Sequence, residues 1–160
     1  MLAAQTTTEQ HSSNKESRNK NFKRYQPMTR IAHVDEIISS SFGLWISSLF
    51  SAISGVNPGI TFEDQKETFF GILEYMLKNG KIKFIAPGAD CYASSNNPKP
   101  RFTIYDIEAH WNAPVEEIIG YLRERWPASA SEENDLDLAI YFYEIPGVIW
   151  IKDSGELVAS

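Results

Sequence analysis

Three histidines, one cysteine and several carboxylates are the side chains of this sequence that could carry metal or acid–base chemistry. His11, His33 and His110 are isolated, and none stands at the i,i+4 spacing from another ligand-type residue in a way that suggests a zinc site. Asp106, Glu108 and His110 are spaced two residues apart, but a surface loop explains them better than a metal site. We therefore expect no metal and no cofactor.

No nucleophile stands in a catalytic setting either. Cys91 follows Asp90, whose charge would raise the thiol pKa, so a bystander thiol is favoured over a nucleophile. Ser154 belongs to a turn rather than to a nucleophile elbow. Glu116 and Glu117 are neighbours on a predicted helix and point in different directions, so they cannot easily flank one bond. We expect that the protein is not an enzyme.

An acidic cluster followed by two tyrosines is the most distinctive polar group. Its members, our candidate partner-binding residues, are Glu132, Glu133, Asp135, Asp137, Tyr141 and Tyr143. The four carboxylates would create a local negative field that steers a basic partner, and tyrosine is enriched at binding hot spots. From the residues alone, the simpler interpretation is favoured: a solvated polar connector at residues 128–135, followed by acids at a helix N-terminus.

Charge is unevenly divided along the chain. Residues 1–30 hold six basic and two acidic residues, and residues 31–160 hold nine and nineteen. We interpret residues 1–30 as a disordered basic tail and residues 31–160 as a single domain. The tail could attract nucleic acid, but with few aromatics and no repeated basic motif a solvated extension is favoured. The acidic body argues for a basic protein partner and makes nucleic acid an unlikely main ligand.

The sequence also bears on the compartment. A single cysteine cannot form an internal disulfide, and the first residues lack the apolar core of a signal peptide. The apolar segment 42–56 is too short and too interrupted by serine and glycine to span a bilayer. We expect a soluble, cytoplasmic protein that does not bind membranes.

Local patterns predict most of the elements that would position these residues. Apolar side chains at three- and four-residue steps predict a helix over 34–53, which Gly43 could split. Thr61 is the predicted N-cap of a second helix that ends at Asn79-Gly80. Residues 81–85 alternate as a half-buried strand.

The second half of the domain is less regular. Residues 86–99 are predicted to be a loop, and residues 101–107 are predicted to be a short strand or an insertion packed on the domain. Asn112 is the predicted cap of a helix that Pro127 stops. Residues 136–145 fit a helix or a strand; an acidic lead-in, with Ser131 or Asn134 as cap, favours the helix. Two short strands joined by a turn at 153–156 complete an α+β domain with three to four helices packed on a small antiparallel sheet and a C-terminal β-hairpin.

The order of these segments resembles a known family. The segments are a helix carrying Leu44-Trp45, ITFEDQKETFFGILEYMLKNGKIKF (60–84), PVEEIIGYLRERWP (114–127), DLDLAIYFYEIPG (135–147) and VIWIKDSGEL (148–157). They are similar to a bacterial family known only as the domain of unknown function number five hundred and ninety-six. The resemblance covers roughly residues 34–158, with a longer insertion at 86–110 than the family pattern has.

The resemblance implies a function that the residues alone do not. Members of that family lie near secreted polymorphic toxins, including those of contact-dependent growth inhibition, and some resemble immunity proteins. The leading hypothesis is therefore an immunity-type protein that neutralises a cognate toxin in the cytoplasm. The alternative is a winged-helix-like, nucleic-acid-associated regulator, because helices followed by a strand, as in 61–85, also occur there. Against it, Glu63, Glu67 and Glu74 on the second helix would repel phosphates.

Overall fold

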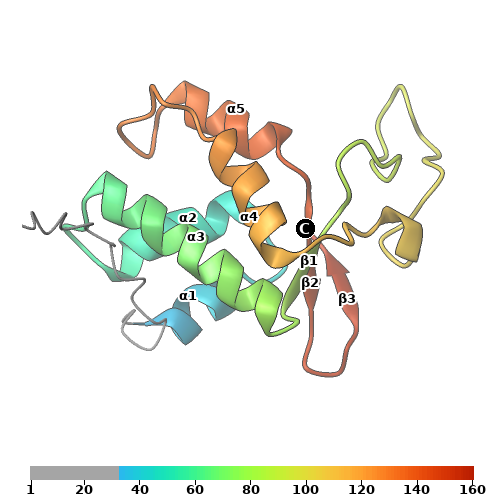
Figure 1. The fold of residues 1–160 in the computed structure, drawn as a ribbon, viewed down its shortest axis with the longest axis horizontal. Coiled ribbons are helices and arrows are strands. Elements are labelled where there is room, and N and C mark those ends of the chain that lie inside the picture. The colour runs from blue at the N-terminus through green and yellow to red at the C-terminus, as the bar shows by residue number, and fades with distance from the viewer. Residues whose placement is uncertain (1–32) are drawn as a thin grey trace, which may run out of the picture.

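The computed structural model describes residues 33–160 (Figure 1), so the predicted basic tail lies outside the described residues. This part of the chain contains five α-helices, one 3-10 helix and three strands. The helices are α1 (Val34–Ser41), α2 (Ile46–Val56), α3 (Phe62–Lys78), the 3-10 helix η2 (Ile107–Ala109), α4 (Val115–Glu124) and α5 (Leu136–Glu144). The strands are β1 (Ile82–Phe84), β2 (Val148–Ile151) and β3 (Leu157–Ala159). The predicted α+β class is confirmed.

The three strands form one antiparallel sheet in the order β1-β2-β3. Lys83 lies opposite Ile149, and Trp150 lies opposite Val158. The predicted C-terminal hairpin is confirmed, and Gly155 takes the positive φ of 88° that its turn requires. On the other side of β1, the Trp111 N–H donates to the Phe84 carbonyl at 2.8 Å, so the chain after the insertion returns along this edge.

The first predicted helix is two helices. The helical conformation is interrupted between Ser41 and Ile46. Gly43, within this interruption, adopts a φ of 76° that few other residues tolerate. The Leu44 N–H donates to the Ser41 carbonyl at 3.0 Å and closes the turn. The three- and four-residue spacing of apolar side chains continues through this turn. The sequence pattern over 34–53 is therefore the same as that of one long helix. The split raises the number of helices above the predicted three to four.

The other helix predictions hold, with two corrections to their caps. Thr61 caps α3 as predicted, because its hydroxyl accepts a hydrogen bond from the Asp64 N–H at 3.1 Å. The segment 136–145 is a helix, α5, but its N-cap is Asp135 rather than Ser131 or Asn134. Helix α4 likewise begins after Pro114, so Asn112 is not its cap.

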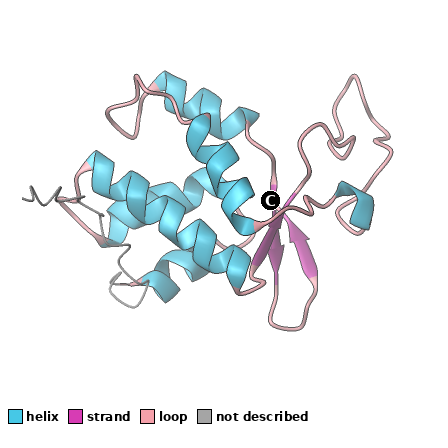
Figure 2. Cartoon of the chain, viewed as in Figure 1, coloured by secondary structure: helices cyan, strands magenta, loops and turns pink. Residues whose placement is uncertain are grey.

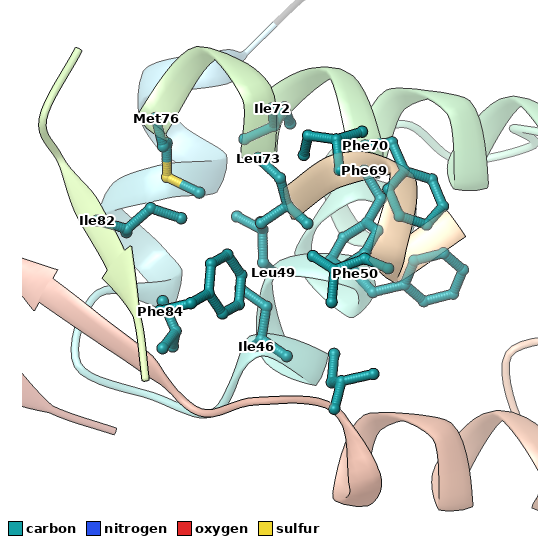
Figure 3. Packing of buried hydrophobic residues seen from close by; sticks show 14 of the residues in the cluster. Ile46, Leu49, Phe50, Phe69, Phe70, Ile72, Leu73, Met76, Ile82 and Phe84 are labelled. Carbon is teal, nitrogen blue, oxygen red and sulfur yellow. The ribbon is translucent and has the colours of Figure 1, made fainter. Parts of the chain in front are cut away.

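The core is built around the apolar face of α3. Figure 3 shows side chains of α3 meeting those of α2 on one side and those of β1 on the other. Phe50 of α2 is 1% exposed, and its ring centroid lies within 6 Å of the centroids of Phe69, Trp126 and Phe142. This aromatic cluster joins α2, α3, α5 and the end of α4.

The elements divide into a helical part and a small sheet at one end. In Figure 1, α3 and α4 lie in front of α2, and α5 lies along the top of the helical part. Residues 86–106 project on the far side of the sheet, without regular secondary structure (Figure 2). Of the two alternatives predicted for 101–107, a short strand or an insertion, the strand does not form, and η2 begins at Ile107.

The aromatic cluster yields a stability prediction. Phe50→Ala should lower the free energy of unfolding by about 3–5 kcal/mol, because the cavity cannot close among four helices. Urea unfolding measures the loss. The matched control is Tyr105→Ala, since Tyr105 is 70% exposed; its effect should stay within about 0.5 kcal/mol. Equal effects of the two substitutions would contradict this placement of the core.

Candidate functional site

Two of the four predicted carboxylates shape the connector before α5. The Asp135 carboxylate accepts hydrogen bonds from the backbone N–H groups of Ser131 and Glu132, at 2.5 and 3.1 Å. These hydrogen bonds hold the pKa of Asp135 below its ordinary value, and the bond from Ser131 has the larger effect. The Ser129 hydroxyl donates to Asp137 at 2.5 Å. Both carboxylates therefore close local turns.

Glu133 connects the same segment to two helices. Its carboxylate accepts from the Ser54 hydroxyl at 2.8 Å and from Gln65 Nε2 at 3.2 Å. Gln65 is only 4% exposed and also donates to the Phe50 carbonyl at 2.9 Å. Burial acts to raise the pKa of Glu133, but hydrogen bonds from Ser51, Ser54 and Gln65 together outweigh it and lower that pKa.

The structure separates the two predicted tyrosine anchors. Tyr141 is buried, and its hydroxyl donates to the Leu122 carbonyl at 2.8 Å. Burial raises the pKa of this phenol, and the charge of Arg123 lowers it in part. Tyr143 is 76% exposed and lies beside Trp45, with 6.5 Å between ring centroids. Of the two, Tyr143 alone is accessible to a partner.

An exposed apolar surface adjoins the acidic cluster. Leu136, Ile140 and Tyr143 lie at i, i+4 and i+7 on α5 and are 73%, 43% and 76% exposed; we call them the α5 stripe. Leu44 and Trp45, in the turn between α1 and α2, are 49% and 58% exposed. The sequence alone did not indicate that Leu136, Ile140, Leu44 and Trp45 would be exposed together. The available signal was that α5, LDLAIYFYE, is apolar on more than one face.

The sequence segments that supply this apolar surface contain no basic residues. Residues 33–65 and 126–151 contain no Lys or Arg, and they supply α1, α2, the connector and α5. They carry nine carboxylates. The basic residues of the described chain lie instead on α3, α4, β1, the insertion and the β2–β3 hairpin. Glu132 and Glu144, both exposed, flank the α5 stripe in sequence.

Three further candidates, Cys91, Asp106 and His110, lie in the insertion at 86–110. Cys91 is half-buried, and burial, with Asp106 and Asp90, raises its thiol pKa. His110 Nε2 lies 2.6 Å from the Ile104 carbonyl, and the Asp106 carboxylate accepts from the Thr103 N–H at 2.7 Å. Within residues 33–160, no group of three or more His, Cys, Asp and Glu side chains is placed so that it could hold a metal ion.

The insertion at 86–110 is ordered by its own polar contacts. The Asp90 carboxylate accepts from Asn97 Nδ2 at 2.6 Å and from the Arg101 N–H at 2.9 Å. The Tyr92 hydroxyl accepts from the Gly147 N–H at 2.7 Å and fastens the loop next to β2. A Cβ at Gly147 would lie 3.0 Å from that hydroxyl oxygen, so glycine permits the contact.

Comparison with known proteins supports the fold only. No family model matches the sequence, and no curated protein matches it. A solved structure described as an uncharacterized protein conserved in bacteria, from Neisseria meningitidis, is similar with a TM-score of 0.53 and 20% sequence identity. The similarity covers 78% of this chain and 84% of that one. In the described range, none of the helices has the length and apolar content needed to cross a bilayer.

The contacts of Glu133 predict a pH dependence. Its folded-state pKa lies below the ordinary value of 4.5, so its stabilisation is full above that value and is lost as pH falls through the lowered folded pKa. Glu133→Gln should lower the free energy of unfolding by about 1–2 kcal/mol at neutral pH, with a smaller penalty in acid. Urea unfolding between about pH 3 and pH 7 measures both.

Glu132, the exposed neighbour of Glu133, provides the control for the Glu133→Gln substitution. Glu132→Gln should leave both the stability and its pH profile close to wild type, because the Glu132 side chain is exposed. If the two variants gave the same profile, Glu133 would not be the carboxylate that links the connector to α2 and α3.

Proposed function

We propose that this chain is an immunity-type binding protein that neutralises a cognate polymorphic or contact-dependent toxin in the cytoplasm. The resemblance to the domain of unknown function number five hundred and ninety-six supplies the toxin context. The proposal assigns the chain no catalytic step, metal or cofactor. Neutralisation would follow from covering a functional surface of the toxin.

The observation that carries the proposal is the separation of charge described above. The elements α1, α2, the connector and α5 carry carboxylates and no Lys or Arg of their own, and the lysines nearest α1, Lys81 and Lys152, come from the sheet end of the domain. Such a surface attracts basic proteins and speeds their encounter. A toxin that acts on nucleic acid must itself present positive charge to phosphates, and it would be steered onto this surface.

Among the described residues, the charges of α3 count against the nucleic-acid alternative. The solvent-facing side of α3 carries Glu63, Asp64 and Glu67, which would repel phosphates. The neighbouring cations are engaged with these acids: Lys66 Nζ lies 3.7 Å from Glu63, and Arg123 forms a bidentate pair with Glu67 at 2.9 and 2.8 Å. A DNA-reading role would need a basic face on this helix.

Co-expression tests the proposed function. We expect the chain to restore growth of cells that express the C-terminal domain of a polymorphic toxin encoded beside its gene. The purified proteins should bind one another, and raising the salt concentration should lower their association rate about tenfold or more. A paired toxin with a neutral or acidic domain, or growth arrest despite co-expression at equal levels, would count against the proposal.

A further inference from the structure

The outward face of α5 is apolar although the core does not need it. The inward face already buries Leu138 and Tyr141, and Ile145 continues this burial just after the helix. The α5 stripe lies on the other side and remains largely exposed. A helix that borders solvent normally presents polar side chains there, and grouped exposed apolar residues mark interaction surfaces.

Trp45 extends the stripe beyond α5. Its ring packs against that of Tyr143, and both remain more than half exposed. The adjacent Leu44 carbonyl accepts a hydrogen bond from Trp150 Nε1 at 2.9 Å, and Trp150 is 1% exposed. The turn that presents Trp45 is thus attached to the central strand. Two exposed aromatic rings on fixed backbone are typical of binding hot spots.

The charges around this surface select the kind of partner. Glu132 and Glu144 are exposed near its two ends, and Asp137 is exposed beside Leu136. None of the elements that form the surface supplies a Lys or Arg. A second copy of the chain would bring the same carboxylates against these, which costs binding energy. A partner with Lys or Arg around an apolar centre would satisfy both parts of the surface.

We propose that the α5 stripe, with Leu44 and Trp45, is the docking surface for an amphipathic helix of a basic protein, with apolar side chains flanked by Lys or Arg. In taking the toxin as the source of that helix, the proposal rests on the proposed function. The apolar residues hold the partner, whereas Glu132 and Glu144 steer its approach. Glu133 and Asp135 of the connector, and Asp137 in the first turn of α5, accept internal hydrogen bonds and support α5 rather than holding the partner.

Binding kinetics with the toxin domain encoded beside the gene, in an inactivated form, test this division of roles. Trp45→Ala and Tyr143→Ala should each raise Kd about tenfold or more, mainly through faster dissociation. Glu132→Gln with Glu144→Gln should instead lower the association rate and its salt dependence. Tyr105→Ala and Ile107→Ala are the matched controls, because these residues are 70% and 79% exposed on the insertion; they should change Kd less than about threefold.

A second probe tests the surface when the toxin domain does not bind. The probe is a synthetic helical peptide with Leu on one face and Lys on its flanks, compared with a scrambled peptide of the same composition. The wild-type chain should bind the patterned peptide more tightly, and the double variant Trp45→Ala/Tyr143→Ala should lose that preference. Circular dichroism verifies that each variant remains folded.

The outcomes separate the two proposals. If the chain neutralises the toxin and the Trp45 and Tyr143 variants bind it with unchanged Kd, the proposed function stands and the proposed docking surface is wrong. If the chain does not neutralise the toxin but the double variant loses the peptide preference, the proposed docking surface stands and the proposed function is wrong. Equal peptide binding by wild type and double variant would overturn the surface, as would a dimer in sedimentation that these two substitutions abolish.

Discussion

The packing of Phe50 against Phe69, Trp126 and Phe142 determines how the helices of this domain are arranged. One ring of α2 thereby contacts α3, α5 and Trp126, which lies just beyond the end of α4, so none of these elements can rotate independently. For α5 this fixes which side is inward. Once Leu138 faces the core, the residues at 136, 140 and 143 must face outward, whatever their polarity. The exposed apolar surface follows from the core and from the composition of α5 together.

Glu133 is the polar counterpart of this aromatic packing. A half-buried carboxylate is costly without partners, and here it accepts hydrogen bonds from two different helices. It holds the connector against the core at the place where α5 begins. The acidic segment thus has a mainly architectural part. The surface that remains open to a partner is therefore the apolar one beside the acidic segment. The remaining carboxylates lie around that apolar surface.

The sequence predicted those elements whose determinants are local. Thr61 and Gly80 specify the ends of α3, and Gly155 specifies the hairpin, because each acts within a few residues. The partners of Glu133 are distant in sequence, at Ser54 and Gln65, and no spacing rule connects them. Periodicity also groups Leu136 with Ile140 without saying whether another element covers them. The acidic neighbourhood of the site was therefore predictable, whereas its apolar centre required the three-dimensional arrangement.

The hydrogen bond from Trp150 to the Leu44 carbonyl has a consequence for recognition. It secures a short interhelical turn to the middle strand of the sheet, and the positive φ of Gly43 sets the direction of that turn. Trp45 is consequently held in place before any partner arrives, and little backbone order remains to be gained on contact. Such preorganisation lowers the entropic cost of association. A rigid platform of this kind favours partners whose shape already matches it over those that would need it to adapt.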